Sequence, residues 1–416
     1  MAAIAESQRQ LACALAVFFA AVAPLQADWP QWRGPNRDGV VHGVKVPATW
    51  PPSLKELWKI DVGEGVASPV AGGNRVYVFT RQKEDERAIC LDISSGRELW
   101  RTDGYAAPYE WQLGEGNFSK GPRSTPVLAD GKLYTYGVSG ILSCLDAGTG
   151  ATLWRHECLP VPPYASNSPL VTDGLCLVHY GDFHKNGGLT AFDAVNGQRK
   201  WCFAEGSNPM CVSPIVVDLA GQRQIVTSTL WEFVGVSVAT GEKLWGQKAS
   251  FGLGTRCVTP IQYKDLLIFA DYQGPPWAFR LEKTGQGIAA KEVWHAEGIS
   301  QYYTTPVIAG NRLFGMSTRK VGCFFCLDAD SGKTIWESDG RQGENASILR
   351  AGNVFLILTS SGRLIVVDTQ AASLKPLTEY QVSETRTYAH PIFLGDRILI
   401  KDEATLRCLA IESQAE

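Results

Sequence analysis

Short segments in which apolar and polar residues alternate recur along the chain, and a turn follows each of them. Residues 88–92 alternate in this way, a turn that ends at Gly96 follows, and residues 98–100 begin a second apolar segment. Alternation with a period of two predicts strands, and glycine supplies the positive φ that a tight hairpin turn requires. The pattern therefore predicts β-hairpins along the chain.

The hairpins share a phrase: an apolar residue, Asp, three residues, Gly, three residues and Trp. A further copy has Ser237 in place of Asp. Self-similarity at about 40 to 50 residues with strand-like content predicts a propeller of four-stranded blades. Seven tryptophans share the register: Trp58, Trp100, Trp154, Trp201, Trp245, Trp294 and Trp336. Because each Asp recurs at the same turn, we expect it to accept hydrogen bonds from turn N–H groups and not to act as a catalytic acid.

A second marker consists of a small hydroxyl or similar residue, proline and an aliphatic residue. Proline is tolerated at the first residue of a strand, so the marker predicts the start of the innermost strand of each blade. Ser347-Ile348 fills one position without the proline. The other seven copies are Ser68-Pro69-Val70, Thr125-Pro126-Val127, Ser168-Pro169-Leu170, Ser213-Pro214-Ile215, Thr259-Pro260-Ile261, Thr305-Pro306-Val307 and His390-Pro391-Ile392.

The two ends of the repeat region complement each other. Trp58 lies in a fourth-strand phrase that no first three strands precede, and residues 405–411 form a third strand that no fourth strand follows. We therefore expect the N-terminal strand to complete the last blade, which removes two free sheet edges. Tyr380 stands near the tryptophan position of the degenerate seventh copy. The prediction is an all-β fold: one eight-bladed β-propeller domain over residues 56–416, after a leader at 28–55.

Composition and charge agree with this fold. The chain is 45% hydrophobic with 42 glycines and 22 prolines, as many short strands joined by tight turns require. The formal net charge of −3 and the lack of a Lys/Arg run argue against a nucleic-acid partner.

Residues 1–27 resemble an export signal. Arg9 precedes an apolar run at 11–25, and Leu25-Gln26-Ala27 offers a cleavage site, so the mature chain would begin at Asp28. The run is short for a membrane span. We expect a periplasmic or secreted protein with no transmembrane segment in the mature chain.

The six histidines show no zinc-ligand spacing, although His179 and His184 flank Gly181-Asp182 in a loop, where metal binding is an alternative. Cys323 and Cys326 form a C-x-x-C, but Leu327 follows where haem attachment needs His. Repeat-equivalent positions two residues before the turn Asp predict small buried core residues at Cys90, Cys144, Cys326 and Cys408.

The phrases at 144–154 and 326–336 resemble the tryptophan-docking repeats of the pyrroloquinoline quinone (PQQ) propellers. That superfamily contains quinoprotein alcohol dehydrogenases and BamB-type assembly proteins, which lack the cofactor. For the dehydrogenases the resemblance implies Arg and hydroxyl or amide donors around PQQ, a calcium ion, an Asp base, a stacked Trp and commonly two adjacent cysteines. This chain has no adjacent Cys-Cys pair, and its motifs place neither the Trp nor the Asp. PQQ and calcium therefore stay open as cofactors.

The fold predicts a ligand site where the loops enter the innermost strands, around the central channel. Arginines there suit an anionic ligand, and Glu64, Asn167 and Asn345 offer oxygen ligands for calcium. The alternative is that these polar groups hold water and satisfy strand ends. The candidates are Glu64, Arg123, Asn167, Arg256, Gln301, Tyr302, Tyr303, Asn345, Arg386, Tyr388 and His390.

Three functions are consistent with the sequence. The favoured one is a non-catalytic binding or assembly platform in the cell envelope with an envelope protein as partner. The second is a PQQ- and calcium-dependent alcohol or sugar dehydrogenase, and the third is binding of another small anion in the channel. Residues 103–122 form a long insertion rich in aromatic residues, which either covers the channel, docks a partner or packs on the propeller.

Overall fold

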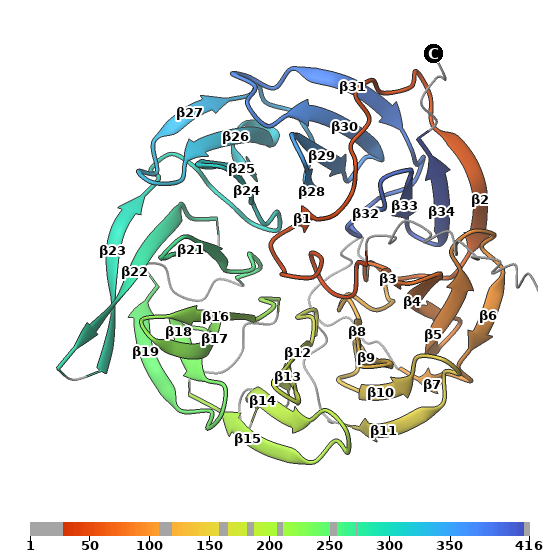
Figure 1. Ribbon diagram of the computed structural model, residues 1–416, viewed down its shortest axis with the longest axis horizontal. Helices are drawn as coiled ribbons and strands as arrows, with labels where there is room; N and C mark the ends of the chain where they lie inside the picture. The colour runs from red at the N-terminus through yellow and green to blue at the C-terminus, as the bar shows by residue number, and fades with distance from the viewer. Residues whose placement is uncertain are drawn as a thin grey trace, which may run out of the picture.

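Eight antiparallel sheets form a ring around a central channel in the computed structural model (Figure 1). The structure describes residues 28–107, 119–157, 165–180, 187–205, 211–249, 256–271, 273–285 and 287–411. Each blade runs from an inner to an outer strand, so the predicted eight-bladed propeller is confirmed. Within the described ranges, no helix is long and apolar enough to cross a membrane.

The first four blades follow chain order and occupy residues 70–248. A short strand, β7 (Tyr105–Ala106), pairs with β5 of the first blade. The strands of these blades are β3 (Val70–Gly72), β4 (Arg75–Gln82), β5 (Asp85–Asp92) and β6 (Glu98–Arg101); β8 (Val127–Ala129), β9 (Lys132–Tyr136), β10 (Leu142–Asp146) and β11 (Thr152–His156); β12 (Leu170–Thr172), β13 (Leu175–Tyr180), β14 (Gly188–Asp193) and β15 (Arg199–Phe203); β16 (Ile215–Leu219), β17 (Gln222–Ser228), β18 (Glu232–Ser237) and β19 (Lys243–Lys248).

The other four blades complete the ring, and the N-terminal strand β2 joins the last of them. A 3-10 turn, η1 (Arg319–Val321), connects two strands of the sixth blade, and β1 (Val40–Val41) pairs with β28. The strands are β20 (Ile261–Tyr263), β21 (Leu266–Ala270), β22 (Pro276–Thr284) and β23 (Gly287–His295); β24 (Val307–Ala309), β25 (Arg312–Ser317), β26 (Cys323–Asp328) and β27 (Thr334–Glu337); β28 (Ala346–Ala351), β29 (Val354–Thr359), β30 (Arg363–Asp368) and β31 (Pro376–Gln381); β32 (Ile392–Phe393), β33 (Arg397–Lys401), β34 (Thr405–Ala410) and β2 (Lys55–Asp61).

The ring closes between the two ends of the repeat region, as predicted. Strand β2 pairs antiparallel with β34 from Lys55 opposite Ala410 to Asp61 opposite Thr405. The outer strand of the eighth blade therefore comes from the start of the chain. Backbone hydrogen bonds between distant segments hold the ring shut.

Antiparallel strand order gives the ring two faces. The turn face carries the tight turns between first and second strands and between third and fourth strands. The loop face carries the connections between second and third strands and from blade to blade. Figure 1 shows the long β22–β23 hairpin extending outward from the ring.

Most register tryptophans dock onto the next blade. The Trp58 indole N–H donates to the carbonyl of Ile93 at 3.1 Å, and the same bond recurs in the next blades. A Cβ on Gly96 would lie 2.7 Å from the Trp58 ring, so the turn glycine leaves room for the indole besides taking positive φ. These contacts join neighbouring blades.

Two junctions depart from this arrangement. Trp245 donates at 2.5 Å to Gln224 of its own blade, because the fifth blade has the long β22–β23 hairpin in place of the usual turn. Tyr380 donates at 2.6 Å to the carbonyl of Pro51. The eighth blade has no third-to-fourth turn to receive an indole, since its outer strand comes from the other end of the chain.

The turn carboxylates bind the turn backbone, as predicted. Asp92 accepts hydrogen bonds from the N–H groups of Ser94 at 3.1 Å and Ser95 at 2.9 Å. Hydrogen bonds from the hydroxyls of the same two serines, together with these backbone bonds, lower the pKa of Asp92 to about 2. The same type of bond lowers the pKa of Asp146, Asp193 and Asp328.

The hydroxyl residues of the second marker link the innermost strands of neighbouring blades. The backbone N–H of Ser68 donates to the Thr125 hydroxyl at 3.2 Å, and the N–H of Thr125 donates to the Ser168 hydroxyl at 3.0 Å. The N–H of His390 donates to Ser68 at 2.8 Å across the closure. We call the eight marker positions the hydroxyl ring: Ser68, Thr125, Ser168, Ser213, Thr259, Thr305, Ser347 and His390.

Candidate functional site

The leader fills the central channel from the turn face. Trp29 forms an antiparallel bridge with Ala71, and β1 pairs in parallel with β28 of the seventh blade. Figure 1 shows this segment in red crossing the centre of the ring. Gly34 makes the close packing possible, because it has φ +83° and a Cβ there would lie 2.7 Å from the Trp29 ring.

Two buried arginines of the leader bind backbone carbonyls of the inner strands. Arg33 donates to the carbonyls of Thr305 at 3.0 Å and Pro306 at 2.7 Å. Arg37 donates to the carbonyls of Pro214 at 2.8 Å and Pro169. Burial lowers the pKa of Arg33 to about 10 and that of Arg37 to about 9, so both remain cations at neutral pH.

Trp32 links the leader to two further blades. Its indole N–H donates to the Thr259 hydroxyl at 2.9 Å, and its ring meets His390 edge-on at 4.5 Å between centroids. With the bond from the Leu128 N–H to the Pro30 carbonyl, the leader contacts all eight blades. The channel is therefore occupied by the chain itself on the turn-face side, and a ligand would approach from the loop face.

Four predicted site residues lie in the interior, where most of them serve structural contacts. Arg256 pairs with Asp271 at 2.9 Å and donates to the carbonyls of Thr229 and Leu230. Asn167 accepts from the N–H of His179 at 3.0 Å. Gln301 and His390 are also buried, and burial lowers the pKa of His390 well below its usual value.

Two further predicted residues bond to the backbone or to hydroxyl groups of the loop face. Glu64 pairs through its backbone with Arg81 at the end of β4. The Asn345 side-chain oxygen accepts from the Thr304 hydroxyl at 2.6 Å. The three oxygen donors proposed for calcium thus belong to the first, third and seventh blades, and two of their side-chain oxygens already accept hydrogen bonds.

The remaining five predicted residues, which form two pairs and a single arginine, lie at the loop-face end of the channel. Tyr302 and Tyr303 stack at 3.6 Å between ring centroids, and the Tyr303 hydroxyl donates to Tyr302 at 2.7 Å. Arg386 hydrogen-bonds to Tyr388, whose pKa is raised by burial. Arg123 is half-buried and lies close enough to Cys211 to lower the pKa of that thiol.

The structure adds Ser166, Cys211 and Cys257 to this mouth. Cys211 hydrogen-bonds to Cys257 and to Ser166. Burial raises the pKa of the Tyr303 phenol, and the two nearby thiols act in the same direction. Ser166, Cys211, Cys257 and Tyr303 occupy one repeat position, two residues before a member of the hydroxyl ring. We call that position the mouth ring: Val66, Arg123, Ser166, Cys211, Cys257, Tyr303, Asn345 and Tyr388.

The mouth ring could have been found in the sequence from its register. Counting two residues back from each hydroxyl-ring member names Ser166, Cys211 and Cys257 together with Arg123 and Tyr303. The candidates predicted near each marker were polar and aromatic residues, and they did not include the two cysteines. What the sequence did not show is that neighbouring blades bring the two thiols into contact.

The described residues at this mouth do not fit a calcium–PQQ pair. Arg256 is held by Asp271 and two carbonyls, and the side-chain oxygens of Asn167 and Asn345 bind other groups. Among the described residues, no group of three or more His, Cys, Asp or Glu side chains is placed to hold a metal ion. His179 is buried and bonds to Thr227 at 2.9 Å, while His184 lies outside the described residues.

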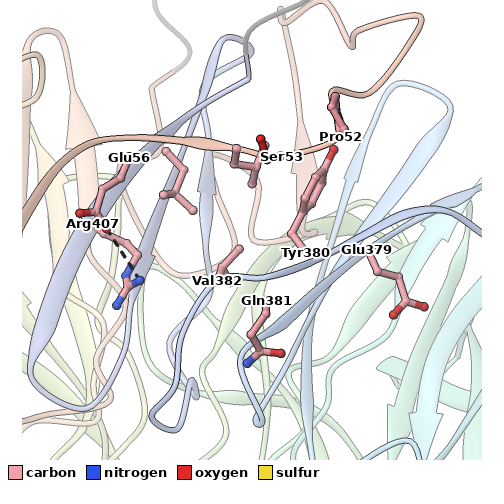
Figure 2. A pocket seen from close by; sticks show the side chains of 10 residues that line it. Pro52, Ser53, Glu56, Glu379, Tyr380, Gln381, Val382 and Arg407 are labelled. Carbon is pink, nitrogen blue, oxygen red and sulfur yellow. Dashed lines mark ion pairs between the residues drawn. The ribbon is translucent and has the colours of Figure 1, made fainter.

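A hollow of about 390 Å³ lies at the ring closure (Figure 2). Its walls come from the segment that enters β2, the end of β31 and the end of β34. Glu56 and Arg407 form an ion pair at 3.8 Å on one side, and Tyr380 forms part of the wall. In most blades the turn between the third and fourth strands accepts a tryptophan of the preceding blade. The eighth blade has no such turn, and the hollow lies at that place.

Apolar side chains are exposed on the loop face. Trp231 between β17 and β18 is 52% exposed, and Val321 at the end of η1 is 69% exposed. Tyr303 at the channel mouth is also exposed. The long insertion at 103–122 begins on this face too, but residues 108–118 of that segment lie outside the described residues, as does the signal segment 1–27.

Comparisons with known sequences point to one family. The chain matches the family described as "Outer membrane protein assembly factor BamB" over residues 45–108 and 105–338. It is 24% identical over 309 residues to the outer membrane protein assembly factor BamB of Burkholderia pseudomallei, covering 71% of this chain and 72% of that protein. It is also 24% identical over 320 residues to the dehydrogenase subunit of a quinone alcohol dehydrogenase from Gluconobacter oxydans. That match covers 68% of this chain and 40% of the subunit.

Solved structures share the fold. BamB from Moraxella catarrhalis superimposes with a TM-score of 0.64 at 14% identity, covering 86% of this chain and 99% of that one. A quinohemoprotein alcohol dehydrogenase from Comamonas testosteroni gives 0.68 at 15% identity, covering 95% and 82%. At these identities the likeness shows the propeller fold alone.

Proposed function

Because the chain belongs to the PQQ-like β-propeller family typified by BamB, we propose that it is an exported, non-catalytic platform that binds a protein of the cell envelope through its loop face. Relatives named as outer membrane protein assembly factors support such a partner. They also support export, to which the sequence at 1–27 adds a signal segment with cleavage near Ala27.

The observation that carries this proposal is the contrast between a filled channel and an apolar loop face. Arg33, Arg37 and Trp32 occupy the channel with groups of the chain itself. Trp231, Tyr303 and Val321 meanwhile expose large apolar or aromatic groups on the loop face. Such side chains are enriched at the centres of protein interfaces, where they lose water on binding.

A PQQ-dependent dehydrogenase is the second candidate, and quinone alcohol dehydrogenases among the relatives favour it. The same channel mouth would have to supply donors to a tricarboxylate and to calcium. The contacts of Arg256, Asn167 and Asn345 argue against that role. A small anion held by Arg123 or Arg386 would need fewer donors and is the third candidate.

A pair of valines with matched exposure tests the platform. Val321 on the loop face is 69% exposed and Val195 on the turn face is 68% exposed. We expect V321E to weaken capture of the envelope partner by at least about tenfold, because a charge at the centre of an interface must lose its water. V195E should leave capture unchanged, and both proteins should melt at the wild-type temperature.

Crosslinking in envelope extracts, followed by mass spectrometry of the captured protein, measures the effect. Equal capture by V321E and V195E would refute the loop-face platform. Titration of the purified mature protein with PQQ and calcium, with dye-linked oxidation of alcohols and sugars, is the second arm. Micromolar PQQ binding with turnover would establish the dehydrogenase instead.

A further inference from the structure

Two thiols from neighbouring blades meet at the loop-face mouth of the channel. Cys211 precedes the fourth blade and Cys257 precedes the fifth, each two residues before a hydroxyl-ring residue and proline. Their thiols hydrogen-bond to each other, and both residues are half-buried. The contact is therefore fixed by the blade arrangement and lies at a partly accessible surface.

The surroundings of the pair are polar. The Ser166 hydroxyl bonds to Cys211, and the Arg123 guanidinium lies nearby. The hydrogen bond from Cys257 is the main effect that lowers the pKa of Cys211, with Ser166 and Arg123 acting in the same direction. The same hydrogen bond and burial raise the pKa of Cys257. Cys211 is thus favoured as the thiolate of the pair.

The other strand cysteines have a different environment. Cys90, Cys144, Cys326 and Cys408 are buried in the blades, and burial raises the pKa of each to about 11. A protonated, buried thiol is a poor nucleophile, because the thiolate is the reactive form. Within the described part of the chain, these four core thiols thus differ from the Cys211–Cys257 pair, which lies at a partly accessible surface.

We infer that Cys211 and Cys257 are a redox site that reacts with a low-molecular-weight disulfide and closes to an intramolecular disulfide across the blade junction. The Cys211 thiolate attacks one sulfur of the reagent, whose S–S bond breaks and releases one thiolate. The Cys257 thiol then loses its proton and attacks the Cys211 sulfur of the mixed disulfide, releasing the second thiolate. Two electrons pass from the cysteine pair to the reagent, which leaves as two thiols.

An exported chain, as proposed above, would meet such oxidants, since disulfides persist in the periplasm and outside the cell. The inference itself needs only the thiol contact, and it stands whether or not the loop face binds a protein. A small reagent is favoured because both thiols are half-buried.

The test uses the mature protein and oxidised glutathione as the probe. After equilibration, acid quenching and alkylation of the denatured chain, we expect two fewer alkylated cysteines than in the reduced protein. Peptide mapping should join Cys211 to Cys257. Reduction with dithiothreitol should restore both thiols.

Three variants separate the roles. C257S should accumulate a glutathione adduct on Cys211, whereas C211S should lose both the disulfide and most of the adduct. The control C326A, altered in a buried core thiol, should form the disulfide as the wild type does. An unchanged thiol count after glutathione treatment, a disulfide elsewhere, or an adduct that forms equally in C211S and C257S would overturn the inference.

Discussion

The hydroxyl ring and the mouth ring lie two residues apart in every blade, yet they differ in character. The hydroxyl ring repeats Ser or Thr at nearly every position, and its oxygens accept backbone N–H groups of the preceding blade. The mouth ring has Val, Arg, Ser, Cys, Tyr and Asn at its eight positions. Uniform residues thus hold the blades together, and varied residues give this propeller its own chemistry.

The same contrast separates the two ends of the channel. On the turn-face side the leader binds carbonyls of the inner strands through Arg33 and Arg37. At the loop-face end the thiols, tyrosines and Arg123 are only partly buried. The buried groups of the leader support the fold, while the partly exposed groups at the mouth are accessible to ligands and partners.

Removing a leader arginine should give the largest effect on stability. R33M deletes the donor to the carbonyls of Thr305 and Pro306, which stay buried without a partner. Each unsatisfied carbonyl costs roughly 1–3 kcal/mol, so the two together should lower the free energy of unfolding by at least about 2 kcal/mol. Although R33M also removes a buried cation, the stranded carbonyls make the net change destabilising.

Thermal unfolding and limited proteolysis of the leader measure this loss. The control R223M removes an exposed arginine paired with Asp173 and Asp218, and should cost less than about 1 kcal/mol. If R33M melts like R223M and its leader resists protease equally, the leader does not stabilise the ring.

The sequence predicted the ring of blades, but it did not predict that the leader occupies the central channel. Eight blades, the closure by β2 and the turn carboxylates all follow from local patterns that repeat, so each copy supports the others. The leader occurs once and has no repeat, and its place depends on contacts with all eight blades. Its role in the channel could therefore not be derived from its residues.

The site residues divide in the same way. Proximity to the proline marker placed Arg123, Tyr303 and Tyr388 at the mouth, but it also selected Arg256, which an ion pair with Asp271 holds inside. The sequence could not separate these cases, because the partner of Arg256 lies at the end of another strand. Tyr380 likewise marked a departure from the repeat, and only the ring closure explains why Trp is absent there.

The stability contributed by the buried carboxyl of Glu86, on the loop face, should change with pH in the opposite direction to that contributed by the turn carboxylate Asp92. Glu86 accepts from the Val138 N–H and the Tyr105 hydroxyl, each at 2.9 Å, and burial raises its pKa to about 7. The turn carboxylate Asp92 instead has a pKa of about 2. Its bonds stabilise the fold above about pH 4, and that stability is lost as the pH falls towards 2.

For Glu86 the sign is reversed. Between about pH 4.5 and 7 the unfolded chain has released this proton while the folded chain retains it, so stability falls as the pH rises. We expect E86Q to remove up to about 3 kcal/mol of that decline, measured as the difference in free energy of unfolding between pH 4.5 and 8. The exposed control E282Q should keep the wild-type slope, and an unchanged slope in E86Q would show that Glu86 does not titrate in this range.

The smallest expected effects come from two serines of one loop, Ser168 in the hydroxyl ring and Ser166 in the mouth ring, which allow the two rings to be compared directly. Ser168 of the hydroxyl ring is buried and accepts from the Thr125 N–H at 3.0 Å, so S168A should cost about 1–3 kcal/mol by leaving that N–H unsatisfied. Ser166 of the mouth ring is half-buried, and S166A should change stability by less than about 0.5 kcal/mol. S166A should instead slow alkylation of Cys211 by iodoacetamide, because the lost hydrogen bond raises the pKa of that thiol.

Thermal melts and alkylation rates at pH 7 measure both effects on both variants. Equal melting losses, or faster alkylation in S166A, would remove the distinction between a ring that holds the blades and a ring that sets their chemistry.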